Sequence, residues 1–117
     1  MKIQTKRIYE PAAKADGYRI LIDRLWPRGF TKEGAPMDTW MKDIAPSTEL
    51  RKWYNHEPAK WEAFCKKYYA EIEGSDALQE LLSDIRKHKT VTFLTASKNE
   101  EYNHAIALRQ LVQKHLK

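Results

Sequence analysis

Residues 18–29 read Tyr-Arg-Ile-Leu-Ile-Asp-Arg-Leu-Trp-Pro-Arg-Gly, and the first half of this stretch decides the fold. Ile20, Leu21 and Ile22 are apolar at successive positions, a pattern that is typical of a strand buried on both faces. The strand ends before Pro27, because proline has no amide proton to donate to a strand ladder. The stretch therefore predicts a central strand of an α/β sheet.

Two other segments predict further strands. Residues 3–9 alternate apolar and polar side chains, and residues 91–95 are mostly β-branched or aromatic. The 38–88 interval between the second and third strands has a helical pattern, and a crossover of this length allows those two strands to lie parallel. Only a short loop separates the first strand from the second, so the pattern leaves the direction of the first strand open.

Apolar residues recur at helical spacing throughout the 38–88 interval. Ser47 is placed to cap one helix, with Trp53 on the inward face of that helix. The segment before it, from Asp38 to Ile44, is expected to form a short helical turn. The remaining helices of this interval are expected to start at Pro58 and at Ser75.

A last helix is expected after the third strand. Ser97 and Glu100 match the spacing of a capping box, in which a hydroxyl and a carboxylate three residues apart satisfy two free amides. Asn99 is an alternative cap. Together these patterns predict an α/β fold: a small, mostly parallel sheet of three or four strands flanked by helices, in a single domain over residues 1–117.

Size and composition narrow the class of protein. A chain of 117 residues has the length of one domain, and 42% hydrophobic with 32% charged residues is typical of a folded protein. The longest apolar run is only a few residues, so we expect no membrane-spanning segment and no membrane partner. The polar first seven residues lead us to expect no signal peptide. One cysteine cannot form an internal disulfide, so we expect a cytoplasmic protein.

Positive charge exceeds negative charge modestly. The chain has 21 Lys and Arg against 16 Asp and Glu, a net charge of +5 at pH 7, and a basic chain is compatible with nucleic-acid binding. No run of five like charges occurs, and acidic residues lie between the basic ones almost everywhere. Such dispersed charge usually marks a solvated surface, so nucleic acid stays an alternative partner.

Polar side chains follow two predicted strands at their carboxyl ends, where open α/β sheets bind ligands. After the central strand, Arg24 and Arg28 offer planar donor forks that suit phosphate or carboxylate groups, and Trp26 is a platform for a base or ring. After the last strand, Ser97 and Lys98 supply a hydroxyl, an ammonium group and a helix N-terminus, which favours an anion. We therefore expect an anionic small molecule to bind between the two strand ends.

His104 and Asp23 are the candidate catalytic residues of this site. A histidine titrates near neutral pH and serves as acid or base, and Asp23 is placed to orient it. Structural interpretations stand beside these roles. They are an ion pair between Asp23 and Arg24, a lid over the core for Trp26, a plain helix cap for Ser97, and hydrogen-bonded support for His104.

No pattern in the chain indicates a metal or a cofactor. The four histidines lack the spacing of a metal site. Cys65 lies on the apolar stripe of its predicted helix, where core packing is the expected role. The glycine motifs that cradle phosphates or expose a nucleophile are absent from the sequence. We therefore expect no dedicated metal site and no cofactor.

Several segments of the chain resemble one family. Residues 23–29 (DRLWPRG) resemble the hallmark of the YeaO-like branch of the domain-of-unknown-function 488 family. The resemblance continues in residues 44–47 (IAPS), 50–54 (LRKWY), 56–58 (HEP), 92–98 (TFLTASK) and 103–105 (NHA). It covers nearly the whole chain and implies a single small α/β domain in a bacterial, cytoplasmic protein. It implies no activity, because the family is named for lacking an assigned one.

The resemblance also sharpens the choice of site residues. The matching positions include polar groups that a core does not need, and on this ground Asn103 joins the candidate ligand-binding residues. Broader relatives carry a cysteine at the end of the last strand and a Cys-His-Arg run in the last helix. This chain has Thr95 or a neighbour at the first place and Asn103-His104-Ala105 at the second. Of that set, only His104 carries over.

Three functions are compatible with these observations. The first is a small enzyme acting on an anionic, nucleotide-like ligand held by Arg24, Arg28 and Lys98. The second is a nucleic-acid binding module that uses the same arginines with Trp26. The third is a non-catalytic regulatory or interaction protein that binds a protein or a small ligand without turnover. Nothing in the pattern indicates an oligomeric state.

Overall fold

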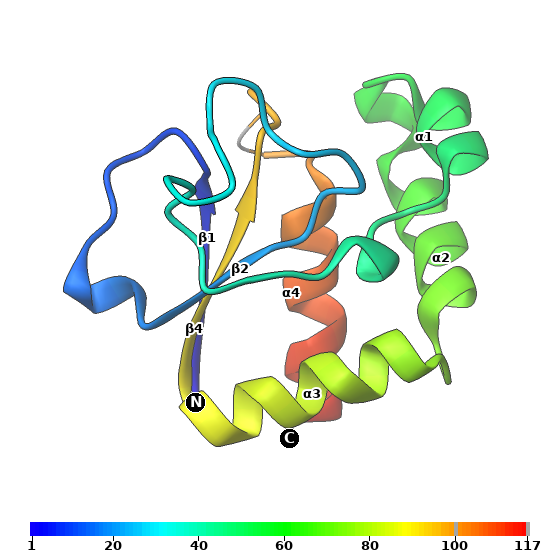
Figure 1. Ribbon diagram of the computed structural model, residues 1–117. Coiled ribbons are helices and arrows are strands. Elements are labelled where there is room, and N and C mark those ends of the chain that lie inside the picture. The colour runs from blue at the N-terminus through cyan, green and yellow to red at the C-terminus, as the bar shows by residue number, and fades with distance from the viewer. Residues whose placement is uncertain (100, 117) are drawn as a thin grey trace.

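The apolar stretch that follows Gly17 forms a central strand of a parallel sheet (Figure 1). The computed structural model describes residues 1–99 and 101–116 of the chain. Within these residues the sheet has the strand order β1-β4-β2-β3, and neighbouring strands are parallel. The strands are β1 (Lys2–Arg7), β2 (Tyr18–Leu21), β3 (Thr39–Trp40) and β4 (Thr90–Thr95). The expectation of a small parallel α/β sheet is confirmed.

β4 lies between β1 and β2, and this order settles the direction of the first strand. Ile3 is in register with Val91, and Arg7 with Thr95, in a parallel pair. β2 pairs with the other side of β4, also in parallel. Residues 8–17 therefore return the chain from the carboxyl end of β1 to the start of β2, and the carboxyl ends of all strands meet at one edge.

The helices cover one face of the sheet, and loops cover the other. In Figure 1 the helices lie to the right of and below the strands, whereas the loop of residues 8–17 lies on the left. The expectation of a sheet flanked by helices is confirmed, and the core between the sheet and the four α-helices lies on one face. The helices are α1 (Thr48–Tyr54), α2 (Trp61–Ile72), α3 (Asp76–His88) and α4 (His104–His115), with the 3-10 turns η1 (Lys14–Asp16), η2 (Lys42–Ile44) and η3 (Pro58–Lys60).

Alternate residues of the central strands face these two layers. Ile20 and Phe93 face the helices and belong to the main core, which includes side chains of all four α-helices. Leu21 and Leu94 face the other way and pack with loop residues such as Phe30. The central strand is therefore buried on both faces, as its unbroken apolar run predicts.

Serine side chains cap two of the helices as their sequence pattern predicts. The hydroxyl of Ser47 accepts a hydrogen bond from the amide of Leu50, and that of Ser75 accepts one from Leu78, each at 3.1 Å. These contacts satisfy amides that have no partner inside the first helical turn. The starts of α1 and α3 are thus set locally.

One side chain of α1 lies differently from expectation. Trp53, expected to face inward, is 37% exposed. Its ring lies 4.9 Å from the ammonium group of Lys60 and 5.0 Å from that of Lys67. A tryptophan ring attracts cations at such distances, so the surface position is compatible with its large apolar area.

The segment expected as a helical turn at Asp38–Ile44 joins the sheet instead. The amide of Asp38 donates to the carbonyl oxygen of Arg19, and its carboxylate accepts a hydrogen bond from the Arg19 amide, both at 2.8 Å. This two-way contact holds Thr39–Trp40 beside β2 as the short edge strand β3. Only Lys42–Ile44 keeps a helical turn, of the 3-10 kind.

The last helix starts later than its capping-box pattern predicts. Asn103 is the cap, because its Oδ1 atom accepts a hydrogen bond from the amide of Ile106 at 3.1 Å. The hydroxyl of Ser97 accepts one from the amide of Asn99 at 3.3 Å, which forms a local turn rather than a helix start. Glu100, the second member of the expected box, lies outside the described residues.

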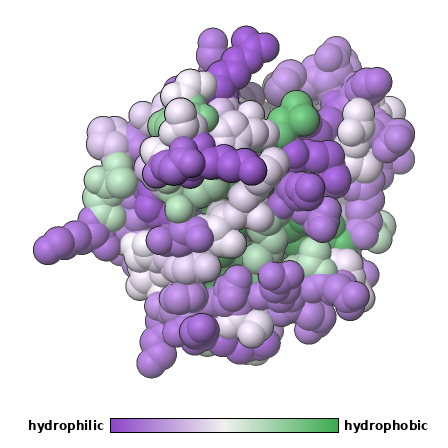
Figure 2. Space-filling view, viewed as in Figure 1, coloured by the Kyte–Doolittle hydropathy of each residue, from purple (hydrophilic) through white to green (hydrophobic). Residues whose placement is uncertain are grey.

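The visible surface is mostly hydrophilic. Figure 2 shows hydrophilic side chains over most of the visible face, with apolar residues in small separate areas. Among the described helices, none combines the length and the apolar character needed to cross a membrane.

Candidate functional site

Asp23 is the central polar group at the carboxyl edge of the sheet. It follows β2, where the amide of Ile22 donates to the carbonyl oxygen of Leu94 at 3.0 Å and so keeps β2 against β4. One oxygen of Asp23 accepts a hydrogen bond from the hydroxyl of Thr95 at 2.7 Å, and the other accepts one from the amide of Ala96 at 2.8 Å. The carboxylate therefore ties together the ends of the two central strands.

His104 contacts the same carboxylate from the first turn of α4. Its Nε2 atom lies 3.0 Å from Oδ1 of Asp23 and 3.1 Å from the carbonyl oxygen of Ile22. Because both neighbours are acceptors, Nε2 carries the proton, and only Nδ1 is left to exchange one. The ring also lies edge-on to Tyr68, with 6.5 Å between ring centroids.

The surroundings of Asp23 keep it ionised. Burial alone would raise its pKa, but the hydrogen bonds and charge of His104 and the hydrogen bonds from Ala96 and Thr95 outweigh burial, so the pKa lies below the ordinary value. An ionised carboxylate only accepts hydrogen bonds, so Asp23 is suited to orient His104 and unsuited to donate a proton. The side chains of Asp23 and His104 are 15% and 14% exposed.

The nearest hydroxyl does not complete a catalytic set. The proton of Thr95 goes to Asp23, and its oxygen accepts a hydrogen bond from the amide of Ser97 at 3.2 Å. Among the described residues, Asp23 is the base in contact with this hydroxyl. Its lowered pKa makes it a weak proton acceptor, and Thr95 is only 2% exposed. Among the described residues, no group of three or more His, Cys, Asp or Glu side chains is placed to hold a metal ion.

Arg24 is occupied by the backbone of a neighbouring loop. Its guanidinium group donates to the carbonyl oxygen of Ala45 at 3.0 Å and to that of Pro46 at 3.4 Å. Asp23, its chain neighbour, is paired with His104 instead. Arg24 thus holds the segment that leads into α1.

Trp26 supports the loop in which it lies. Its indole nitrogen donates to the carbonyl oxygen of Phe30 at 2.8 Å, and its ring lies edge-on to Trp40 at 5.3 Å between centroids. Trp40 in turn donates from its indole nitrogen to the carbonyl oxygen of Asp23 at 2.7 Å. The two rings brace the turn after β2 against β3.

Of the three remaining candidate residues, one has a structural role and two are exposed cations. Asn103 is buried as the cap of α4, and its amide group also donates to the carbonyl oxygen of Asn99 at 2.7 Å. Arg28 and Lys98 are exposed. Within residues 1–99 and 101–116, no hydrogen bond or ion pair engages either cationic side chain.

Arg7 is the site residue that the sequence pattern missed. It is the last residue of β1, and its Nε atom donates to the carbonyl oxygen of Ser97 at 3.1 Å. The guanidinium carbon lies 5.3 Å from the centre of the Tyr9 ring. The only signal in the sequence is the strand alternation, which puts Arg7 at the end of the face that carries Ile3.

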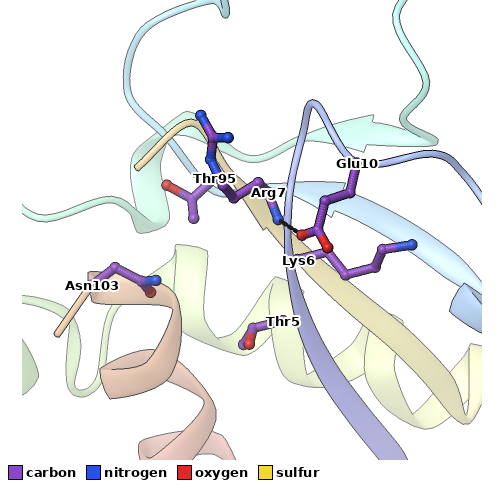
Figure 3. Close-up of a pocket in the computed structure, with 6 residues that line it drawn as sticks. All are labelled: Thr5, Lys6, Arg7, Glu10, Thr95 and Asn103. Carbon is purple, nitrogen blue, oxygen red and sulfur yellow. Dashed lines mark hydrogen bonds between the residues drawn. The ribbon is translucent and has the colours of Figure 1, made fainter. Parts of the chain in front are cut away.

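A polar cavity of about 270 Å³ lies beside Arg7, between the end of β1 and the start of α4. Figure 3 shows Arg7 extending toward Thr95, Lys6 pointing to the opposite side of β1, and Asn103 at the start of the helix. The other lining residues are Thr5 and Glu10. The cavity is therefore formed by strand ends that only the folded sheet brings together.

The guanidinium group of Arg7 is the principal unpaired charge of this cavity. The carboxylate of Glu10 accepts a hydrogen bond from the backbone amide of Arg7 at 2.7 Å, so it is partly occupied. The ammonium group of Lys6 is 3.2 Å from the carboxylate of Asp16. Among the described residues, nothing accepts a hydrogen bond from the two terminal nitrogens of Arg7.

Comparison with known proteins identifies the family. A family model described as the inactive DUF488-N3 subclade matches residues 2–117. The chain belongs to the DUF488 family. The resemblance carried by residues 23–29 and the later motifs is thereby confirmed.

Two relatives of this DUF488 chain are similar over nearly their whole lengths. The uncharacterized protein YeaO of Escherichia coli is 46% identical over 108 residues, which cover 92% of this chain and 94% of that protein. An uncharacterized protein of Mycobacterium bovis is 39% identical over 111 residues, or 95% and 93% of the two chains. No solved structure matches this DUF488 chain.

Proposed function

We propose that this DUF488 chain binds an anionic small ligand, such as a phosphate ester or a nucleotide, at the carboxyl ends of β1 and β4, without turning it over. The observation that carries the proposal is the guanidinium group of Arg7, which lines the polar cavity with two terminal nitrogens that no described residue engages. A planar guanidinium fork matches the geometry of phosphate and carboxylate groups.

Arg7 is held in place before any ligand arrives. Its Nε atom is bound to the carbonyl oxygen of Ser97, and the Tyr9 ring lies under the guanidinium group. The hydroxyl of Tyr9 donates to the carbonyl oxygen of Arg28 at 3.0 Å, which fixes the ring to the next loop. Such support reduces the side-chain entropy that a ligand must otherwise overcome.

Two further cations belong to the same edge of the sheet. Lys98 follows Ser97, the backbone partner of Arg7, and Arg28 provides the carbonyl oxygen that accepts from Tyr9. Both side chains are exposed. In this proposal they strengthen the attraction for an anion and add little specificity, because exposed lysine and arginine act mainly through long-range charge.

Binding without turnover fits the polar groups at the centre of the edge. The carboxylate of Asp23 is occupied by Thr95, Ala96 and His104, so it is a bridge between elements. The Thr95 hydroxyl is buried and donates a hydrogen bond to Asp23, which is a weak base because its pKa is lowered. The family description, which calls the matching subclade inactive, supports the same choice.

A thermal-shift screen tests the proposal. The panel contains nucleoside monophosphates, sugar phosphates, dicarboxylates and a short oligonucleotide, measured on the wild type, Arg7→Gln and the control Arg86→Gln, which removes an exposed cation of α3. A ligand present at 100 times its dissociation constant stabilises the fold by about 2.7 kcal/mol, a shift of several degrees for this chain length. We expect the shift to disappear in Arg7→Gln and to remain in Arg86→Gln.

Two results would count against the proposal. An equal thermal shift in Arg7→Gln would mean that the ligand binds elsewhere. A screen in which no compound shifts the unfolding temperature would exclude small anions as ligands. If the oligonucleotide alone gives a shift, and its affinity falls steeply with salt, the chain is a nucleic-acid binding module instead.

A further inference from the structure

We propose that the free edge of β1 binds an extended acidic peptide segment of a partner protein, which adds a fifth strand to the sheet. The inference rests on the proposed function, because an acidic side chain of the peptide takes the anion position at Arg7. Addition of a strand to a sheet edge is a general mode of peptide recognition, in which the backbone gives affinity and side-chain pockets give specificity.

β1 is the strand at one edge of the sheet. The amides of Lys2 and Ile8 donate toward the β4 side, to the carbonyl oxygens of Lys89 and Thr95. Backbone groups alternate in direction along a strand, so those of Ile3 and Thr5 point away from β4. Within residues 1–99 and 101–116, no backbone group pairs with these outward amides and carbonyls.

The outward-pointing backbone amide at the end of β1 already has a hydrogen-bond partner. The amide of Arg7 donates to the carboxylate of Glu10 at 2.7 Å, as Figure 3 shows. Glu10 therefore limits pairing to the part of β1 that precedes Arg7. A partner strand gains backbone hydrogen bonds at Ile3 and Thr5 and reaches the guanidinium group only with a side chain.

Two cavities lie between β1 and α4, one at each end of the strand. The first is the polar cavity lined by Arg7 and by Asn103 at the start of α4. The second, of about 370 Å³, is lined by Met1 and Ile3 of the strand segment and by Gln113 and Leu116 at the end of the helix. A strand added to β1 passes along both of them.

The spacing of the cavities matches the period of a strand. Ile3 and Arg7 face the helix layer and are four residues apart, which corresponds to about 13 Å along a strand. Side chains four residues apart on an added strand also point to one face. The added strand therefore carries an apolar residue that enters the cavity beside Ile3. Four positions away it carries an acidic residue that binds the guanidinium group of Arg7.

Charge decides between an acidic partner and a second copy of this chain. Lys2, Lys6 and Arg7 give the first seven residues three positive charges and no negative one. If β1 pairs with β1 of a second copy of this chain, two sets of three positive charges face each other across the two strands. Like charges on paired strands destabilise the pairing. An acidic strand meets the opposite sign, so it is the occupant that fits.

Synthetic peptides test the inference on the intact chain. We use eight-residue peptides with one leucine and one glutamate four positions apart, in both orders, because the edge accepts either strand direction. The matched control has the same composition with leucine and glutamate adjacent. We expect one of the two spaced peptides to bind at least tenfold more tightly than the control, and a glutamine in place of its glutamate to remove most of that gain.

Two readouts report strand pairing rather than charge alone. Hydrogen exchange is expected to slow at least tenfold at the amides of Ile3 and Thr5 when the peptide binds, while those of Lys2 and Ile8 are already bonded. Thr5→Pro removes one outward amide and leaves the β1–β4 ladder intact, since proline is tolerated where the amide faces away from the sheet. This variant is expected to weaken peptide binding at least tenfold.

The outcomes separate this inference from the proposed function. Binding of the small anions without binding of any peptide overturns the inference and leaves the proposed function standing. Peptide binding that is equal for spaced and adjacent peptides, or without slower exchange at Ile3 and Thr5, overturns strand addition. Dimerisation of the peptide-free chain with protection of the same two amides identifies a second copy as the occupant. Absence of binding by both peptides and small anions overturns both proposals.

Discussion

Nε2 of His104 lies 3.0 Å from Oδ1 of Asp23, and this contact fastens the start of α4 to the end of β2. The same carboxylate holds the end of β4 through Thr95 and Ala96. Three segments that lie far apart in the chain thus meet on one acidic side chain. Asp23 and His104 are the two candidate catalytic residues that the sequence predicts, and the contact between them stabilises the fold.

Replacement of His104 by alanine is expected to destabilise the fold. The substitution removes a donor from a largely buried carboxylate, and loss of such a partner costs about 1–3 kcal/mol. Urea unfolding measures the difference, with His115→Ala as the control. His115 pairs with Glu73 at the surface, so its loss is expected to cost about 0–1 kcal/mol. Equal effects of the two substitutions would contradict a structural role for the Asp23–His104 contact.

The stability of the protein is expected to fall in acid. Burial opposes ionisation of Asp16 and Asp23, but hydrogen bonds and nearby cations outweigh it and lower the pKa of both from 3.8. A carboxyl with a lowered folded-state pKa contributes stability above its unfolded value, and that contribution is lost as pH falls through the folded value.

Urea unfolding between pH 7 and pH 2 therefore should show a loss that starts near pH 4 and grows below it. Asp23→Asn is expected to be less stable at pH 7 and to have a flatter profile below about pH 4, because one of the contributing carboxyls is gone. An unchanged slope in this variant would mean that Asp23 does not have a lowered pKa.

Gly17 is expected to tolerate no side chain. Its φ angle is +64°, and a Cβ atom would overlap the backbone carbonyl group of Thr90. Gly17→Ala is expected to cost about 2 kcal/mol or more, as strain and overlap add. Gly29 also has a positive φ angle, +87°, but nothing lies within 4 Å of its would-be Cβ. Gly29→Ala is expected to lower the free energy of unfolding by about 1 kcal/mol. Thermal unfolding of the two variants separates the effect of atomic overlap at Gly17 from that of backbone strain alone at Gly29.

Arg24 and Arg7 are expected to respond oppositely to substitution. Arg24→Ala frees the carbonyl oxygens of Ala45 and Pro46, so we expect a loss of about 1–3 kcal/mol in unfolding free energy. The ligand-induced thermal shift should survive in this variant, whereas Arg7→Gln should lose it. A shift that disappears in Arg24→Ala at a ligand concentration saturating the wild type would assign the anion to Arg24 instead.

The thiol of Cys65 is expected to react slowly. Burial raises its pKa, so little thiolate is present at neutral pH. Labelling with an aromatic disulfide reagent should therefore be much slower in the native protein than in denaturant. Fast labelling of the native protein would contradict the core position that the apolar stripe of α2 predicts.

Most elements of this fold follow from local patterns in the chain. The apolar run at residues 18–22 predicts a central strand, and the serines before α1 and α3 predict caps, because strand propensity and capping depend on near neighbours. Asp23 and His104 were identifiable as site residues, since polar groups at strand ends and near a helix start belong to the expected ligand edge.

Contacts between distant segments decide the rest. Arg7 looks like an ordinary edge residue until β1 pairs with β4 and brings its guanidinium group to Ser97, 90 positions away. The two-way contact between Asp38 and Arg19 likewise turns a predicted helical turn into β3. Local periodicity records which face of an element is apolar, but strand order and register determine which polar groups meet, and those arise from long-range packing. The sequence thus specifies the strands, the caps and the Asp23–His104 candidates, while the Arg7 cavity exists only in the folded sheet.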